Sequence, residues 1–165
     1  MREIKFRGKA IMPTEKMDEI GIKHEDGWVV GSLIHNNGKP WIVGDIIESD
    51  DEYIIHDFWV MVHPESVGQY TGLKDKNGKE IYEGDILKVY EITQYRFKEP
   101  KEKIIEYISP VFWKDYGWIV NENESVEVPL VLLDKNRNFV DTVNEIEIIG
   151  NIYEDKHLLE SEVTE

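Results

Sequence analysis

The chain has 165 residues, no cysteine and a formal net charge of −15. A chain of this length forms one domain or two small ones, and it can bury a core without covalent cross-links. The absence of cysteine excludes disulfides and zinc sites built on thiolates. The acidic residues are spread over both halves of the chain, which disfavours binding to nucleic acid because such binding depends on Lys and Arg.

The first residues of the chain alternate between polar and apolar, with Ile4 and Phe6 on one face, and this period predicts a strand over residues 2–7. Four basic residues lie close together in this segment: Arg2, Lys5, Arg7 and Lys9. We interpret them as the solvated face of the strand, with a local basic patch as the alternative. Thr14 to Gly21 predicts a short helix capped by Thr14 and ended by the glycine, or a mobile loop.

The next segment, up to residue 66, has the pattern of a small antiparallel sheet. Turns at residues 25–27 and 36–38 enclose a strand that begins at Trp28, and a return strand follows from Lys39. Pro40 lacks an N–H group, so this strand begins there or lies at an edge. Residues 48–52 form an acidic loop, and residues 53–62 predict a strand with a bend near His56. We expect an N-terminal β region of residues 1–66.

The central stretch, residues 69–88, contains two tight turns. Asp75 to Gly78 suits a type I turn closed by a left-handed glycine, and a two-residue turn centred on Asn77-Gly78 is the alternative. Glu83-Gly84-Asp85 predicts a second turn, and residues 86–90 have the β-branched and aromatic composition of a strand. A meander of such short strands closes most simply into a small barrel. We therefore expect a barrel domain over residues 67–154.

The rest of the chain predicts further strands. They are expected at residues 104–108, 111–113, 118–120, 126–133 and 145–149, with a charged loop at 96–103. The strand at 126–133 is expected despite Pro129. Residues 155–165 form a charged tail, in which Leu158 and Leu159 provide either one docked helical turn or a frayed end.

No catalytic or cofactor motif stands out, so the sequence assigns no catalytic residue, and we predict no cofactor and no metal site. The histidines lack the i, i+4 spacing of a zinc helix, and neither a Walker loop nor a Gly-x-Ser-x-Gly sequence occurs. His56, Asp57 and His63 would converge only if the chain bends back between them, and we interpret them as a chance cluster. Carboxylates gather at residues 50–52 and at Glu80, Glu83 and Asp85; we expect solvated loops there rather than an acid–base pair.

Aromatic and basic residues allow two interpretations each. The tryptophans are Trp28, Trp41, Trp59, Trp113 and Trp118. They suit the core of a small barrel, although a row of them on one face would bind a peptide or stack on bases. The best cation cluster surrounds the central hairpin and consists of Lys74, Lys76 and Lys79, which we interpret as a solvated turn tip.

The stretch from Gln69 to Ile86 resembles the central motif of the YopX-like proteins of phages and prophages. Residues 1–9, 28–35 and 148–154 are similar to further segments of that family. The resemblance implies a mostly β protein with an SH3-type barrel in the C-terminal part. Together with the strand pattern, we expect a small SH3-type barrel or pseudobarrel there and an N-terminal antiparallel β region packed against it. No activity transfers with it. Two stretches depart from shorter members, residues 91–103 and 121–144, and they leave the number of strands open.

We therefore expect a non-enzymatic accessory protein that acts by binding another protein. One alternative is an acidic protein that mimics or associates with nucleic acid, which needs carboxylates in a regular row. A carboxylate or histidine enzyme is the third hypothesis. We expect a cytoplasmic protein, because no apolar run approaches the ~20 residues of a membrane span and no signal peptide opens the chain. Small sheets expose edge strands, and self-association through such an edge is a further expectation.

Overall fold

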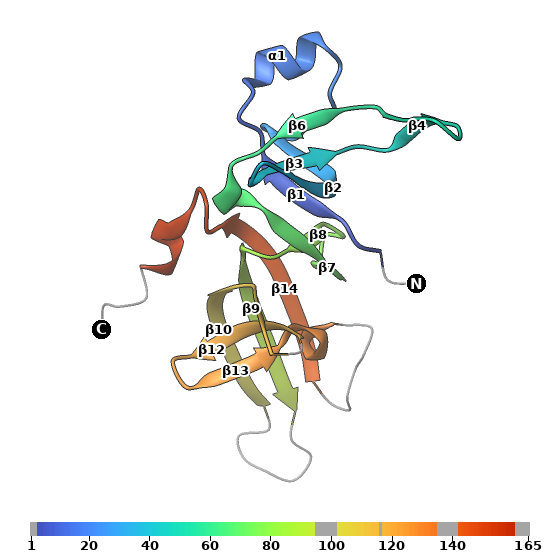
Figure 1. The fold of residues 1–165 in the computed structure, drawn as a ribbon. Coiled ribbons are helices and arrows are strands. Elements are labelled where there is room, and N and C mark those ends of the chain that lie inside the picture. Colours follow the sequence, from blue (N-terminus) through green and yellow to red (C-terminus); the bar gives the residue numbers. More distant parts are fainter. Residues whose placement is uncertain (1–2, 95–101, 116, 135–141, 161–165) are drawn as a thin grey trace. The chain divides into compact units, whose positions relative to one another are not determined.

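The computed structural model describes residues 3–94, 102–115, 117–134 and 142–160. Its ribbon, drawn in Figure 1, is mainly β and antiparallel, as the sequence predicts. The chain divides into two compact units, Met1–Tyr70 (unit 1) and Thr71–Glu165 (unit 2). Strand β7 (Gly68–Lys74) begins in unit 1 and ends in unit 2. Each unit has its own hydrophobic core.

Unit 1 is built on an antiparallel sheet in the order β6-β3-β2-β1, and β1 also pairs with the start of β7. Besides β7, the elements of this unit are β1 (Phe6–Lys9), α1 (Thr14–Glu19), β2 (Trp28–Asn36), β3 (Lys39–Val43), β4 (Ile46–Ser49), β5 (Ile54–His56), β6 (Trp59–Met61) and the 3-10 turn η1 (Pro64–Ser66). Alternate residues of a strand share a face, and Val29, Ile42 and Val60 are buried on one face of this sheet. Met17 of α1 packs into the same cluster, so α1 covers that face.

The helix forms without the predicted Thr14 cap. Pro13 occupies the N-cap position, and the hydroxyl of Thr14 instead donates to the carboxylate of Glu15 at 3.4 Å. Gly21 takes a left-handed φ of 75° just after the helix and turns the chain away, as expected. A helix of one and a half turns is unstable by itself, so burial of Met17 in the core is what stabilises it.

The first strand begins at Phe6, later than predicted. Ile4 is exposed, whereas Phe6 packs against the core of unit 1. The basic residues beside it do not form a simple solvated face. The Lys5 ammonium lies 4.7 Å from the centre of the Tyr70 ring, and the Arg7 guanidinium lies 4.8 Å from the Trp28 ring. Neighbouring strands bring these aromatic rings to the same face, where they attract the cations.

The central turn of unit 2 has the geometry that its sequence predicts. Gly78 has a φ of 83° and its N–H donates to the carbonyl of Asp75 at 3.0 Å. Asn77 is not among the residues with positive φ, so the alternative two-residue turn is wrong. Gly84 also has a positive φ, and β9 begins directly after it at Asp85. Both reversals in the central stretch are therefore confirmed.

The remaining strands of unit 2 form two sheets, in the orders β10-β9-β14 and β11-β12-β13. The elements are β8 (Glu80–Tyr82), β9 (Asp85–Gln94), β10 (Glu102–Pro110), β11 (Phe112–Lys114), β12 (Gly117–Asn123), β13 (Val126–Pro129), η2 (Leu130–Leu133), β14 (Thr142–Asn151) and η4 (Lys156–Leu159). Over the described residues these sheets are separate and no closed barrel forms, so the SH3-type detail stays a prediction. Leu87, Val89, Val120 and Leu130 are buried together in the core of this unit.

The strand predicted over residues 126–133 is half right. β13 ends at Pro129, and a 3-10 turn, η2, follows with Leu130 and Leu133 buried on one side. Proline cannot donate a ladder hydrogen bond, and residues i and i+3 of a 3-10 turn lie on the same side. The apolar run therefore fills the core as a turn. Parts of the stretches 91–103 and 121–144, namely residues 95–101 and 135–141, lie outside the described residues.

Candidate functional site

A two-stranded ribbon, residues 46–56, extends from the sheet of unit 1, and we call it the arm. It consists of β4 and β5, which pair with each other. Figure 1 shows β4 pointing away from the sheet of unit 1. Among the described residues no third strand pairs with either of them. A two-stranded ribbon without a covering layer is marginally stable in water, so further contacts must stabilise the arm.

Hydrogen bonds at the base of the arm stabilise it. The Gly44 N–H donates to the Phe58 carbonyl at 3.1 Å, and the Asp57 N–H donates to the Asp45 carbonyl at 2.9 Å. The ring nitrogen Nδ1 of His56 lies 2.7 Å from the carbonyl of Gly44 and donates to it, because a carbonyl only accepts. These bonds continue the β3–β6 ladder into the arm and tie its base to the sheet.

Gly44 is required at this base. A Cβ at residue 44 would overlap the Oδ1 atom of Asp57 and lie 2.5 Å from the ring of Phe58. The Asp57 carboxylate at this place accepts a hydrogen bond from the Phe58 N–H at 2.9 Å. The close approach of backbone and side chains here admits no side chain larger than hydrogen.

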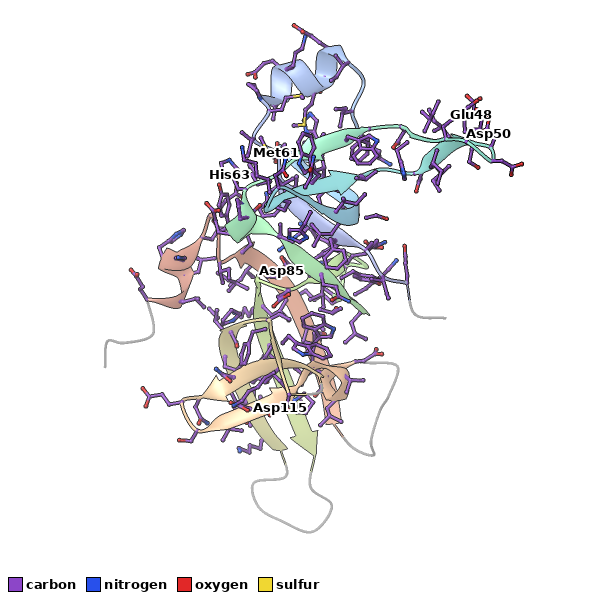
Figure 2. The ribbon with its side chains drawn as sticks, in the orientation of Figure 1. Glu48, Asp50, Met61, His63, Asp85 and Asp115 are labelled. Carbon is purple, nitrogen blue, oxygen red and sulfur yellow. The ribbon has the colours of Figure 1, made fainter. Side chains whose placement is uncertain are left out.

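The tip of the arm is an ordered acidic turn. Figure 2 shows Glu48 and Asp50 at its far end. The backbone N–H groups of Glu52 and Tyr53 donate to the Asp50 carboxylate at 2.7 and 3.0 Å, and they lower the pKa of Asp50. The Tyr53 hydroxyl donates to Glu48 at 2.7 Å, which raises the pKa of Tyr53. The predicted acidic loop is thus a compact Asx turn.

Large apolar side chains of the arm are exposed on both of its faces. Ile54 and Ile55 are adjacent in β5, so they point to opposite faces, yet 59% and 42% of their surfaces are exposed. Further large exposed side chains belong to the arm and to the start of β6: Ile46, Ile47, Tyr53 and Trp59. Isolated exposed apolar residues are common, but a contiguous group on one protruding element is typical of a contact surface.

The two edges of the arm differ. β4 carries a bulge between Ile46 and Glu48, so that Ile47 has no partner in β5. A bulge and a charged side chain are two of the devices that keep an edge strand from pairing with another chain. β5, with the sequence Ile54-Ile55-His56, carries neither a bulge nor a formal charge at pH 7 with neutral histidine. Its edge is therefore the one open to pairing.

The residues with potential chemistry have structural partners instead. The His56 ring bonds to the base of the arm and packs edge-on against Trp59 at 5.3 Å between ring centres. The Asp18 carboxylate lies 3.2 Å from His24, whose other ring nitrogen accepts the Gly27 N–H. In the described part of the chain no group of three or more His, Asp or Glu residues is placed to hold a metal ion. His56, Asp57 and His63 therefore do not form a metal-binding group.

The aromatic residues are divided between core and surface. Trp118 is buried in the core of unit 2 and contacts the exposed Trp113 edge-on, with ring centres 4.8 Å apart. Tyr107 is also in that core, and its hydroxyl donates to Glu91 at 2.9 Å. Burial and this bond raise the pKa of Tyr107. Trp118 and Tyr107 thus agree with the core interpretation, whereas Trp113 and Trp59 do not.

Comparison with known proteins gives one decisive match. The family model described as "YopX protein" matches residues 23–160. The chain belongs to the YopX family. A solved structure, protein EF1440 from Enterococcus faecalis, is similar to this YopX family member, with 21% sequence identity over 96% of this chain and 99% of that chain and a TM-score of 0.48. No curated protein matches the chain.

The YopX match includes the arm and the central motif but not the opening segment, residues 1–9, which also carried the resemblance. The acids of that central motif serve the fold. Asp75 is buried and its carboxylate accepts the N–H groups of Asn77 and Lys79 at 2.8 and 2.9 Å. Asp85 is buried and accepts the Tyr82 N–H at 2.8 Å. Asp85 is therefore not solvated as predicted, and both carboxylates hold a turn.

One of the three lysines beside the central hairpin of this YopX protein has an acidic partner. Lys76 pairs with Glu147 at 2.6 Å, and this hydrogen bond raises the pKa of Lys76. Over the described residues, no helix combines the length and the apolar character that crossing a membrane requires. Sequence reasoning missed the arm as a site. The available signal was the pair of Ile-Ile dipeptides, Ile46-Ile47 and Ile54-Ile55, on either side of an acidic turn.

Proposed function

We propose that this YopX family protein is a non-enzymatic accessory protein of a phage or prophage that acts in the host cytoplasm by binding another protein. The observation that carries the proposal is the arm, a ribbon that presents isoleucine on both faces. Burying a fully exposed isoleucine contributes roughly 1.5–3 kcal/mol, so even half-exposed side chains supply a substantial part of a binding free energy. A partner that covers the arm removes this surface from water.

The hydrogen bonds at the two ends of the arm support the same function. Its base is fixed by the bonds at Gly44 and Asp57, and its tip is fixed by Asp50. A preorganised surface loses less conformational entropy on binding than a flexible loop does. The contact would therefore use the arm in the conformation that it already has.

The other two hypotheses have less support. A nucleic-acid mimic needs free carboxylates in a regular row. Acidic residues on the strands of unit 2 instead pair with lysines, as in Lys88–Glu106 at 2.7 Å and Lys114–Glu127. The buried acids Asp75 and Asp85 are occupied by backbone N–H groups, and an acid–base catalyst needs a carboxyl that can reach a substrate.

The test compares an arm variant with matched controls. Ile54→Ser with Ile55→Ser removes the apolar side chains of β5, whereas Ile20→Ser and Ile104→Ser remove equally exposed isoleucines elsewhere, at 53% and 54%. Immobilised wild-type protein is expected to retain a defined host protein that the arm variant loses and both controls keep. A retained protein that binds the arm variant and the wild type equally, or no retained protein at all, would contradict the proposal.

A further inference from the structure

The outer edge of β5 has a pattern of hydrogen-bonding groups that can be deduced. The Asp57 N–H, just after β5, points toward β4, because it donates to the Asp45 carbonyl. The Tyr53 carbonyl, just before β5, points to the same side, because it accepts from the Asp50 N–H at 3.0 Å. Backbone groups of successive strand residues point to alternate sides. Ile54 and His56 therefore direct their N–H and C=O groups outward, away from β4, where no described strand meets them.

We infer that two copies of this chain join through the outer edges of β5, which pair antiparallel across a two-fold axis at Ile55. This inference rests on the arm being a protein-contact surface and names its occupant as a second copy. With Ile55 facing its counterpart, Ile54 of each copy lies opposite His56 of the other. Both residues of that pair have outward N–H and C=O groups, so each pair exchanges two hydrogen bonds. The product is a four-stranded sheet, β4-β5-β5-β4.

The chemistry of the edge favours a second copy over an unrelated strand. β5 is apolar, without formal charge and without a bulge, so it is complementary to itself in a way that β4, with Glu48 and a bulge, is not. The antiparallel arrangement also sends the two acidic tips in opposite directions. This matters for a chain with a net charge of −15, because two such tips side by side would repel.

The pairing strand carries part of the apolar surface of the arm. Large apolar side chains carry on the order of 150–250 Å² each, and Tyr53, Ile54 and Ile55, which lie on or next to β5, are about half exposed. Two copies thus bring together on the order of 600 Å² of apolar surface, which is typical of a small, weak interface, so the backbone hydrogen bonds supply much of the contact. Pairing also converts two marginal two-stranded ribbons into one four-stranded sheet. We expect a dimer that dissociates at micromolar concentrations.

The native chain has no cysteine, so a single introduced cysteine reports the register. Ile55 faces its counterpart as a non-hydrogen-bonded pair, in which the Cα atoms are about 4.5 Å apart, within the range that a disulfide spans. Ile55→Cys is expected to form a disulfide-linked dimer under mild oxidation. Ile47→Cys on β4, where the native side chain is more exposed at 65%, is the control and is expected to remain monomeric. Equal cross-linking of the two variants, or none at residue 55, overturns the inference.

A second measurement does not depend on a disulfide. Sedimentation of the purified wild type is expected to give a dimer mass at about 100 μM and partial dissociation near 1 μM. Ile54→Pro removes an outward N–H from β5 and is expected to give a monomer, whereas Ser49→Pro, the matched change on β4, is expected to leave the dimer intact. Circular dichroism shows whether both variants are folded. A wild type that is monomeric at the higher concentration, or a folded Ile54→Pro variant that is still a dimer, overturns the inference.

The outcome is separable from that of the proposed function. Self-association is measured on the purified chain, and binding of a host protein is measured by retention. A monomeric chain whose arm still retains a host protein would overturn the dimer and leave the proposed function in place. A dimer that retains no host protein would overturn the proposed function and leave the dimer in place.

Discussion

The Asp75 carboxylate accepts a hydrogen bond from the backbone N–H of Ile148 at 3.3 Å, although the two residues lie 73 positions apart in the chain. The same carboxylate holds its own turn through Asn77 and Lys79. Next to it, the Lys76 N–H donates to the Ile146 carbonyl at 2.8 Å. One buried side chain therefore orders the central hairpin and attaches it to β14.

Removing this carboxylate should destabilise unit 2. We expect Asp75→Ala to lower the free energy of unfolding by about 2–4 kcal/mol, because three N–H groups lose a charged acceptor. Asp51→Ala at the exposed tip of the arm is the control and should change stability by less than about 0.5 kcal/mol. Urea unfolding followed by circular dichroism measures both. Similar unfolding midpoints for the two variants would show that the Asp75 contacts contribute nothing.

Tyr107 should make stability depend on pH in the alkaline range. Burial and the bond to Glu91 raise its pKa above the ordinary value of 10.0. Since the folded state holds the proton more tightly than the unfolded state, this contribution is full below pH about 10 and is lost as the pH rises above it. Unfolding of Tyr107→Phe, compared at pH values from about 9 to about 11, should therefore depend less on pH than that of the wild type.

At neutral pH the same substitution should cost about 1 kcal/mol, because the Glu91 carboxylate loses its hydroxyl partner. Tyr53→Phe is a suitable control, since its hydroxyl bonds to Glu48 at the exposed tip. Identical pH profiles for Tyr107→Phe and the wild type would rule out this role for the Tyr107 proton.

The base of the arm should be sensitive to a single methyl group. Gly44→Ala places a Cβ against Asp57 and Phe58, and we expect it to cost about 1–3 kcal/mol and to displace the arm. Gly117→Ala is the matched control, because a Cβ there meets no atom within 4 Å. Thermal unfolding and the amide NMR signals of the arm measure the two effects. An unchanged arm spectrum in Gly44→Ala would contradict the close packing at this glycine.

The arm should be dispensable for folding. Ile54→Ser with Ile55→Ser removes side chains that lie outside both hydrophobic cores. We therefore expect the free energy of unfolding of the monomer to change by about 0.5 kcal/mol or less per substitution. The comparison is made at a low protein concentration, at which the wild type is also monomeric. A loss of several kcal/mol would mean that these isoleucines belong to the core of unit 1.

The turns were predictable because their causes are local. Asp75, Asn77 and Gly78 are close neighbours in the chain, and the type I geometry follows from an acceptor at the first position and a residue free to take positive φ at the last. The turn at Gly84 was predictable for the same reason, because it also depends on a glycine that is free to take positive φ. Prediction failed for the helix cap at Thr14 and for the strand beyond Pro129, because there the burial of Met17, Leu130 and Leu133 decided the local conformation.

The candidate site was not predictable in the same way. Isoleucine normally enters a core, so Ile46, Ile47, Ile54 and Ile55 differ from the buried Ile42 and Val60 only in the acidic turn that they flank, which does not by itself predict exposure. Likewise, an acid such as Asp75 is expected in solvent by composition, and its burial depends on β14, a distant part of the chain.

The sequence by itself determined a mainly β chain, its tight turns and its membership of the YopX family, since alternation, turn residues and motifs act over a few neighbours. Only the tertiary structure decided which apolar strands are covered and which project as the arm. Burial depends on where segments far apart in the chain meet, and at the arm no described segment of the protein arrives to cover the isoleucines.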